Sequence, residues 1–344
     1  MTAPRIPIQN LYYLLCYAWN RLPQGKLVDV SGVPATELAN LFAHVLCQGI
    51  DHMKRRGLEQ GYELREDELP GVRGRLDILR TARRHLAAHG RAACRLDELT
   101  PNTLPNRILK TTLRRLSNTG GLRDDLRKRV GVLHRDLRGI TETTLNARAF
   151  RAVQLHANNR FYRFLLNVCE FIHGACLPDP EGGGYQFRDL IRDERAMALV
   201  FQNFLFHFIR IELPQWSVGR EHIQWHGVEA QDEARALLPR METDISIQRG
   251  NEHLIIDAKY YQNTLNERHG TQKLHPDNLF QMWAYLTNAQ RAPDVNLSGM
   301  LVYPRVDQTL RCRYSIQGRA LTIATIDLAQ PWENIHAELA ELFA

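Results

Sequence analysis

The 344-residue sequence lacks the features that identify the common zinc-binding, secreted and membrane proteins. Its six cysteines are scattered, no CxxC pair occurs, and no histidine cluster completes a zinc-binding pattern. No stretch approaches the roughly 20 apolar residues of a membrane span. The short apolar run at 11–19 also lacks the basic residues that begin a signal peptide. We therefore expect a cytoplasmic protein with reduced thiols and no membrane contact.

Two common catalytic motifs are missing as well. No G-x-x-x-x-G-K-[ST] phosphate-binding loop occurs, because the glycine run at 182–184 lacks the lysine and the strand–helix context. No G-x-S-x-G nucleophile turn is present either. We expect that this chain binds no GTP itself. The formal net charge of +6 is compatible with a polyanionic partner, but it does not indicate one by itself.

Length and patterning suggest two domains joined by a helical segment. Apolar residues at helical spacing cover three segments of the first half: 7–21, 36–56 and 104–139. Residues 60–100 instead contain short alternating stretches broken by glycine and proline, which are typical of strands. We predict an α+β N-terminal domain over 1–147, with helices plus a small β-sheet or barrel. A helical connector and a Pro- and Gly-rich linker follow over 148–184.

The helices predicted over 104–139 are rich in arginine and lysine. The basic residues are Arg107, Lys110, Arg114, Arg115, Arg123, Arg127, Lys128, Arg129, Arg135 and Arg138. One interpretation is a solvated helix face with charges between the core positions. The other is a surface for phosphate or for an acidic partner.

Residues 185–344 have the pattern of a mixed α/β domain. Helices are predicted over 193–212, 275–289 and 331–343. Strands are predicted over 241–248, 253–260, 299–303 and 321–326.

Two of these strands form a predicted hairpin around the dipeptide Gly250-Asn251. Counting outward from that loop gives a self-consistent register: Arg249 with Glu252, Ile247 with Leu254, and Ile245 with Ile256. The next pair outward is Asp244 with Asp257. The sequence therefore predicts two carboxylates that face each other across the hairpin.

Opposed carboxylates have Cβ atoms about 4.5–5.5 Å apart and repel each other unless something neutralises them. A divalent cation does so, because it prefers oxygen ligands. Lys259 lies two residues beyond Asp257 and projects from the same face, where its ammonium can orient a water or stabilise charge on a phosphate. Asp244, Asp257 and Lys259 thus predict metal-assisted phosphodiester hydrolysis. The competing interpretation is a surface salt bridge between Asp257 and Lys259, with Asp244 incidental.

The following helix carries one polar stripe among apolar residues. Asn278, Gln281 and Tyr285 occupy positions i, i+3 and i+7. Gln281 and Tyr285 lie one turn apart and could contact a phosphate or hold Lys259. A half-exposed amphipathic helix would show the same pattern.

The chain resembles the McrC family, the cleavage subunits of McrBC-type modification-dependent (5-methylcytosine-specific) restriction systems. The segments 240–244 and 254–261 are similar to the nuclease core of that family. Four further stretches agree with its sequences: 6–19, 70–77, 104–110 and 270–281. The resemblance extends over essentially the whole chain.

The resemblance implies a PD-(D/E)xK nuclease domain over 185–344. It assigns metal binding, with Mg²⁺ or in its place Mn²⁺, to Asp244 and Asp257, and catalysis also to Lys259. Gln281 and Tyr285 match the Gln-x-x-x-Tyr helix of a wider nuclease superfamily. Some relatives there carry a further Glu in the first core helix, where this chain has Gln202, although Glu194 lies near the helix start.

The resemblance also implies a partner, an McrB-like AAA+ GTPase ring, and modified double-stranded DNA as substrate. The N-terminal domain would dock onto the motor and stimulate its GTPase. Its Arg-rich helices would face either the ring or the DNA. The alternative function is a non-catalytic adaptor that regulates an AAA+ ring, and the intact triad of residues argues against it.

Overall fold

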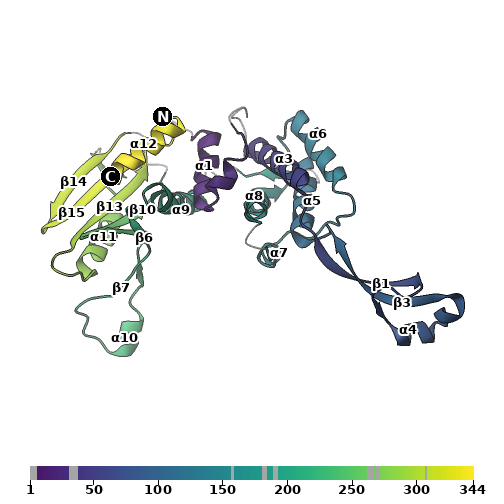
Figure 1. Cartoon of the computed structure of the whole chain (residues 1–344). Helices are drawn as coiled ribbons and strands as arrows, with labels where there is room; N and C mark the ends of the chain where they lie inside the picture. Colours follow the sequence, from purple (N-terminus) through teal and green to yellow (C-terminus); the bar gives the residue numbers. More distant parts are fainter. Residues whose placement is uncertain are drawn as a thin grey trace. The chain divides into compact units, whose positions relative to one another are not determined.

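The computed structural model describes residues 6–30, 38–155, 159–179, 184–188, 193–261, 266–268, 271–306 and 308–344. The chain divides into two compact units (Figure 1). We call them the sheet unit, made of the described residues in 6–27 and 193–344, and the helical unit, made of those in 28–188. No described helix is long and apolar enough to cross a membrane.

The helical unit combines helices with small antiparallel sheets. Its helices are α3 (Leu38–Arg56), α4 (Ile78–Arg83), the 3-10 helix η1 (Leu86–His89), α5 (Leu104–Ser117), α6 (Asp124–Asp136), α7 (Ala147–Arg151) and α8 (Arg160–Ala175). Its strands are β1 (Gly61–Pro70), β2 (Arg75–Leu76), β3 (Arg91–Thr100), β4 (Cys176–Pro178) and β5 (Tyr185–Phe187). Helices α3, α5, α6 and α8 pack together around buried apolar residues such as Leu41, Ile108, Val130 and Leu165.

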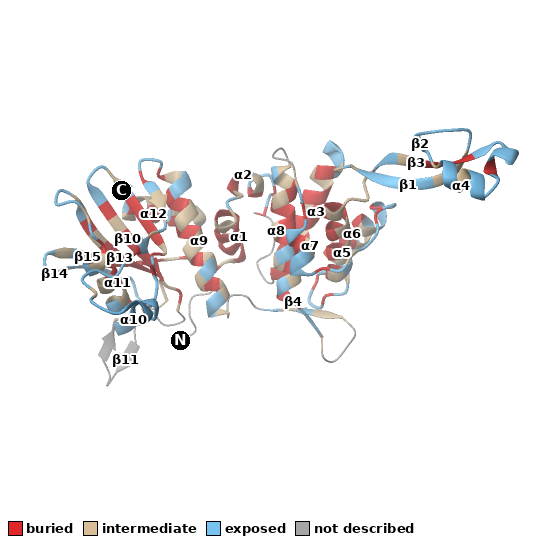
Figure 2. Cartoon of the chain, turned by 90° about the horizontal axis from the view of Figure 1, so that it is seen from below, coloured by how far each residue is buried: buried red, intermediate tan, exposed pale blue. Residues whose placement is uncertain are grey.

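The β-region predicted over 60–100 is a three-stranded sheet of order β1-β3-β2, with no closed barrel among its described strands. Strands β1 and β3 pair over their full length, from Gly61 with Thr100 to Pro70 with Arg91. Figure 2 shows that this ribbon is largely exposed and extends away from the buried helices of its own unit. It therefore adds surface to the unit rather than core.

The sheet unit is a mixed α/β structure. Its helices are α1 (Ile8–Ala18), α2 (Leu22–Gly25), α9 (Glu194–Glu212), α10 (Asp232–Ala236), α11 (Pro276–Asn288) and α12 (Trp332–Leu342). Its strands are β6 (Ser217–Gly219), β7 (His222–Ile223), β8 (Met241–Glu242), β9 (Ile245–Arg249), β10 (Glu252–Ala258), β11 (Asn266–Arg268), β12 (Thr271–Lys273), β13 (Asn296–Pro304), β14 (Arg311–Ile316) and β15 (Arg319–Ile326). The helices predicted over 193–212, 275–289 and 331–343 correspond to α9, α11 and α12.

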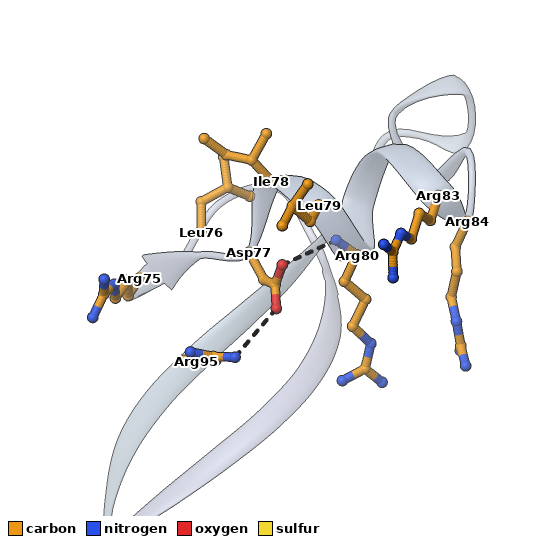
Figure 3. A pocket seen from close by; sticks show the side chains of 9 residues that line it. All are labelled: Arg75, Leu76, Asp77, Ile78, Leu79, Arg80, Arg83, Arg84 and Arg95. Atoms are coloured by element: carbon orange, nitrogen blue, oxygen red, sulfur yellow. Dashed lines mark hydrogen bonds and ion pairs between the residues drawn. The ribbon is translucent and has the colours of Figure 1, made fainter.

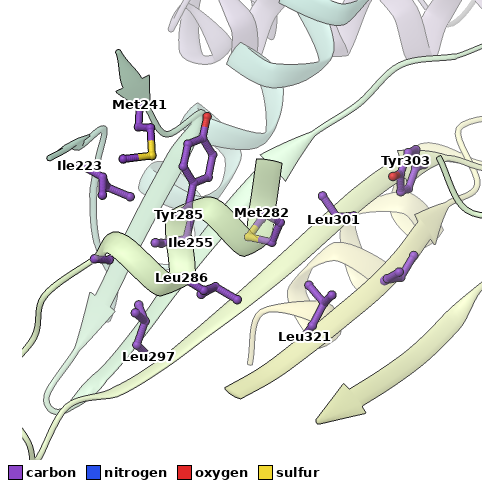
Figure 4. Packing of buried hydrophobic residues seen from close by; sticks show 12 residues of the cluster. Ile223, Met241, Ile255, Met282, Tyr285, Leu286, Leu297, Leu301, Tyr303 and Leu321 are labelled. Carbon is purple, nitrogen blue, oxygen red and sulfur yellow. The ribbon is translucent and has the colours of Figure 1, made fainter. Parts of the chain in front are cut away.

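The central sheet has the strand order β14-β15-β13-β10-β9-β6. Strand β10 lies inside it, parallel to β13 and antiparallel to β9. Helix α11 connects β10 to β13 and packs its apolar face on the sheet (Figure 4). That contact buries Ile255, Met282, Leu286 and Leu301 in one cluster. The continuous apolar run in β10 is thus explained, because a parallel strand inside a sheet is covered on both faces.

The N-terminal helix belongs to the sheet unit, which corrects the predicted boundary of the first domain at residue 1. Helix α1 packs along α9, where the Tyr17 ring lies 5.6 Å from that of Phe204 and 5.5 Å from that of Phe208. The Asn10 amide donates to the Leu328 carbonyl at 2.9 Å. Helical periodicity predicts an apolar face but not the partner that covers it, and here the partner is more than 170 residues away.

The predicted connector over 148–184 is also not a separate element, because α8 forms part of the helical core. Leu165 of α8 contacts the backbone of α3 so closely that a Cβ at Gly49 would lie 2.3 Å from it. The Phe171 ring lies 4.5 Å from that of Phe42. Most of the predicted linker, at 180–183, lies outside the described residues, and the chain on either side pairs as β4 and β5.

At Gly299 of β13, α11 lies close against the sheet. A Cβ added there would lie 2.7 Å from Met282 Sδ and 3.0 Å from Leu286 Cδ1. We predict that Gly299→Ala lowers the free energy of unfolding by about 1–3 kcal/mol through overpacking. Gly219→Ala in β6 is the matched control, since nothing lies within 4 Å of its added Cβ. Urea denaturation followed by circular dichroism compares the two, and equal stabilities would contradict the packing argument.

Candidate functional site

The predicted hairpin register is confirmed. Strands β9 and β10 pair as expected: Arg249 with Glu252, Ile247 with Leu254, and Ile245 with Ile256. The ladder ends at this last pair, so Asp244 and Asp257 are not paired in it. The predicted pairing of these two residues, one step beyond the ladder, is therefore wrong. Asp244 lies just before β9, and its Oδ2 accepts a 2.9 Å hydrogen bond from the Ala258 N–H. The side chain replaces a backbone acceptor and thereby brings its carboxylate to the end of β10.

Asp257 is fully buried, with 0% of its surface exposed. Lys259 Nζ lies 2.9 Å from its Oδ2 as an ion pair. Neither carboxylate oxygen nevertheless accepts a well-directed hydrogen bond from the described residues. Burial raises the pKa of Asp257; the Lys259 ammonium opposes this shift, and the neighbouring Asp244 carboxylate adds to it. The protein thus keeps a carboxylate in an environment that favours its protonation unless further positive charge is present.

Lys259 is held by a chain of hydrogen bonds that begins on α11. Its Nζ donates to Gln281 Oε1 at 2.9 Å, and Gln281 Nε2 donates to Tyr285 Oη at 2.7 Å. Tyr285 Oη in turn donates to the Glu242 carbonyl at 2.8 Å. Burial lowers the pKa of Lys259, but the Asp257 carboxylate outweighs it, so the net shift is upward and the ammonium stays charged. The structure thus brings four of the five predicted site residues, Asp257, Lys259, Gln281 and Tyr285, into one connected group.

Asp244, the fifth predicted residue, is fixed from three elements. Besides the Ala258 N–H on Oδ2, Gln202 Nε2 of α9 donates to Oδ1 at 2.8 Å. Arg220 Nε, from the turn between β6 and β7, donates to the backbone carbonyl of Asp244 at 3.1 Å. The orientation of this carboxylate is therefore set by the packing of α9, β10 and that turn. Sequence reasoning placed Gln202 near the site but missed Arg220, since nothing in the local pattern marks it.

A third acidic ligand is not found among the described residues, where no group of three His, Cys, Asp or Glu side chains is arranged around a metal position. The α9 position nearest the site holds Gln202, which contacts Asp244. Glu194 is the first residue of α9, eight positions earlier and roughly 12 Å along the axis. Asp244 and Asp257 are therefore the acidic side chains at this position.

Asn278, the first residue of the predicted polar stripe, serves a different contact. It is buried, accepts from Tyr261 Oη at 3.1 Å, and donates to Tyr303 Oη at 3.1 Å. It thus ties α11 to the strand ends beyond the site and, within the described residues, makes no hydrogen bond with Lys259. Asn278 of the polar stripe therefore has a structural role, whereas Gln281 and Tyr285 support Lys259.

The residues at this point suit a divalent cation. Asp257 contributes two buried oxygens, one of them 2.9 Å from Lys259 Nζ, and Asp244 contributes a carboxylate that is already oriented. Oxygen ligands of this kind bind Mg²⁺ and Mn²⁺. The ion pair between Asp257 and Lys259 is present, but Asp257 is buried in the sheet and not at the surface.

The Arg-rich helices of the helical unit use most of their charges internally. Seven of the ten predicted basic residues donate to carbonyls or side chains of the same unit: Arg107, Lys110, Arg114, Arg115, Arg123, Arg127 and Arg129. Lys128, Arg135 and Arg138 make no such contact with the described part of the chain. Most of this basic run thus makes contacts within its own unit, which neither interpretation of the sequence included.

A second concave site lies at the tip of the β1-β3-β2 sheet. It has a volume of about 650 Å³ and is lined by nine residues: Arg75, Leu76, Asp77, Ile78, Leu79, Arg80, Arg83, Arg84 and Arg95. Figure 3 shows Asp77 at its centre, bonded to the Arg80 N–H and paired with Arg95. Ile78 and Leu79 are each 70% exposed. Exposed apolar residues beside cationic ones are typical of a protein-binding surface.

Residues 7–304 match the family described as the McrBC 5-methylcytosine restriction system component. The chain belongs to this family. A relative from Escherichia coli strain K12, the type IV methyl-directed restriction enzyme EcoKMcrBC, is 37% identical over 343 residues. The match covers 100% of this chain and 99% of the relative. The resemblance drawn from the sequence is thereby confirmed at the level of the McrBC family.

The fold of this McrBC family member recurs in a solved structure from Thermococcus gammatolerans, a half-complex from a tetradecameric assembly of McrB AAA+ hexamers with bound McrC. The TM-score is 0.60 at 18% sequence identity, over 97% of this chain and 76% of the other. At this identity the likeness concerns the fold. It supports the mixed α/β architecture described above.

Replacing Asp257 by Asn is expected to stabilise the metal-free fold of this McrBC family member. Because the pKa of Asp257 is raised on folding, its ionisation costs stability once the pH exceeds the ordinary carboxyl value of about 4. The stability gain should be absent near that pH and grow as the pH rises toward the raised pKa. Urea denaturation in EDTA at several pH values measures it. A variant less stable than wild type at pH 8 would refute the assignment of a destabilising buried charge.

Proposed function

We propose that this chain is the DNA endonuclease subunit of a GTP-dependent, modification-dependent restriction complex. The observation that carries the proposal is the buried Asp257 carboxylate, which pairs with Lys259 at 2.9 Å and lies beside the oriented carboxylate of Asp244. The arrangement fits the PD-(D/E)xK type of nuclease: an acid before a hairpin, then Asp-x-Lys at the end of a central strand. Membership of the McrBC family supports it.

Asp244 and Asp257 would hold Mg²⁺, for which Mn²⁺ can substitute. When bound, the ion supplies Lewis-acid chemistry and lowers the pKa of a water. It would also return the pKa of Asp257 to the ionised range, because a nearby cation favours the carboxylate. The buried carboxylate whose ionisation is costly without a cation would then be the ligand that the ion requires.

The side chains of this chain position the reacting groups. Lys259 stays protonated beside Asp257 and can donate to the attacking water or to a phosphate oxygen as charge develops there. Gln281 fixes the direction of its Nζ, and Tyr285 fixes Gln281. Sites held by packed helices and strands keep the geometry that such chemistry requires.

The proposed partner is an McrB-like AAA+ GTPase ring, since the solved structure with this fold is a complex of McrB hexamers with bound McrC. GTP would be bound by the ring and not by this chain, in keeping with the missing phosphate loop. The helical unit would dock onto the motor and stimulate it. The exposed apolar and arginine side chains at the sheet tip support such docking. The substrate would be modified double-stranded DNA, delivered to the sheet unit.

The described residues carry one such site per chain. One site cuts one strand, so double-strand cleavage would use two copies of the chain or two encounters. The alternative of a non-catalytic adaptor is disfavoured, because an adaptor has no use for a buried carboxylate that destabilises its fold. Stabilisation by Mn²⁺ in a thermal melt separates the two functions, since only the nuclease gains stability from the metal.

Asp244→Ala, Asp257→Ala and Lys259→Ala are each expected to reduce DNA cleavage by at least about 100-fold, because each removes a charge from the reacting centre. The assay combines the chain with its cognate motor, GTP, Mg²⁺ and methylated duplex DNA. Stimulation of the motor's GTPase should remain, since the helical unit is untouched. Glu252→Ala, an exposed position of the same strand, is the matched control. Normal cutting by the three variants would show that the site is elsewhere.

Gln281→Ala is expected to lower the cleavage rate by about 10–100-fold while Mn²⁺ binding persists, because Lys259 loses its positioning partner. The loss should appear in kcat with KM for DNA unchanged. Thr287→Ala on the same helix is the control, because among the described residues the Thr287 hydroxyl bonds only within α11, chiefly to the Trp283 carbonyl. A lost Mn²⁺ response in Gln281→Ala would mean that the residue supports the fold of the whole site instead.

A further inference from the structure

Two arginines and a histidine gather around the half-buried Phe206 of α9. The guanidinium groups of Arg210 and Arg220 lie 5.6 Å and 5.3 Å from the centre of the Phe206 ring. The His207 ring lies 5.1 Å from the same ring. We call His207, Arg210 and Arg220 the Phe206 cluster.

The cluster adjoins the nuclease site through Arg220. Its Nε donates to the Asp244 carbonyl at 3.1 Å, and its Nη2 donates to Asn203 Oδ1 at 2.9 Å. Asn203 follows Gln202, which holds the Asp244 carboxylate. The guanidinium is thus fixed on two edges and stacked on Phe206, while its Nη1 makes no hydrogen bond with the described residues. It is an exposed cation that is already oriented beside the proposed metal ligand.

His207 adds no positive charge to the cluster near pH 7. Its pKa is lowered to about 4, first by burial and then by the charges of Arg210, Arg220 and Arg21. Its Nδ1 is buried without a hydrogen-bond partner in the described chain. The positive charge of the cluster therefore comes from Arg210 and Arg220, whose guanidinium groups both lie over Phe206. Two like charges at one ring repel each other, and a bound anion relieves that repulsion.

We propose that the Phe206 cluster binds a backbone phosphate of the DNA, next to the phosphodiester that is cut at Asp244, Asp257 and Lys259. The inference rests on the proposed nuclease function. Arginine matches a phosphate with paired N–H donors, and the cluster offers such donors from α9 and from the β6–β7 turn. A DNA strand presents phosphates in succession, so a strand at the metal site carries its next negative charges past this surface.

The stacking on Phe206 assigns a definite role to the cluster. A guanidinium held over an aromatic ring loses little freedom when it binds, so its contact adds affinity and fixes the position of the strand. Phosphate contacts carry no sequence information. The Phe206 cluster therefore sets where the strand lies and leaves the choice of modified base to another part of the complex.

The test is binding of the full chain to a labelled duplex of about 20 base pairs, followed by fluorescence anisotropy in EDTA over a range of KCl concentrations. We expect Arg220→Ala and Arg210→Ala each to weaken binding about tenfold at low salt. Each should also reduce the slope of log affinity against log salt by about one. The loss should be equal for methylated and unmethylated duplexes.

Arg249→Ala is the matched control, because this half-buried guanidinium, which pairs with Glu252, also lies over an aromatic ring, Trp216, at 4.4 Å. It lies at the hairpin end of β9, five residues and roughly 16 Å of strand from Asp244. Its loss removes the same charge, so a similar fall in affinity for Arg249→Ala would reduce the effect to net charge and overturn the proposal. Unchanged binding by both cluster variants would also overturn the proposal. The same holds if the wild-type chain does not bind the duplex at 50 mM KCl, because about six phosphate contacts still give strong binding at that salt concentration.

Two further measurements separate this proposal from its alternatives. If Arg220 only supports Asp244, then Arg220→Ala loses cleavage and Mn²⁺ stabilisation but keeps its affinity for DNA, which refutes the phosphate contact. Arg220→Lys should recover part of the affinity, since it keeps the charge but not the paired donors. Asp257→Ala should keep its duplex affinity while it fails to cut. If Asp257→Ala cuts normally, the nuclease assignment fails, and the affinity series still decides whether the cluster binds phosphate.

Discussion

The burial of one carboxylate, Asp257, governs the architecture around it. A charge inside a sheet is tolerated only when its surroundings supply opposite charge, and here Lys259 supplies part of it. Lys259 in turn needs Gln281, Tyr285 and the carbonyl of Glu242 to hold its position. The helix α11 must therefore sit close on β13, which is why Gly299 has no room for a side chain. The packing of α11 and the chemistry of the site thus both depend on the buried carboxylate of Asp257.

Much of this site could be predicted because its residues are close in sequence. The hairpin dipeptide and alternation fixed the pairing of β9 with β10, and the i, i+2 spacing put Asp257 and Lys259 on one face. The last step of the register failed, since Asp244 uses its side chain where counting assumes a backbone bond. Arg220 could not be predicted, because its contact with Asp244 depends on a turn 24 residues away that carries no pattern of its own.

The domain boundaries show the same limit at a larger scale. Periodicity identified α1 and α8 as apolar helices but left their partners open. The aromatic residues of α1 meet those of α9, so the beginning of the chain belongs to the sheet unit. The basic residues of α5 and α6 suggested a binding surface, yet most of them donate hydrogen bonds to backbone carbonyls or to side chains of their own unit. Charge composition cannot predict these contacts, because it does not reveal which carbonyls a fold leaves unsatisfied.

The place of α1 bears on the order in which the protein can assemble during synthesis. Ribosomes add about 5–20 residues per second, and 176 positions separate the end of α1 from the start of α9, so α1 waits roughly 9–35 s for the helix that covers its aromatic face. The described residues of the helical unit all lie within 28–188, so this unit can fold during that interval. The sheet unit, with the carboxylates of Asp244 and Asp257, can form only after it. A ribosome-bound chain therefore completes the helical unit well before Asp244 and Asp257 come together.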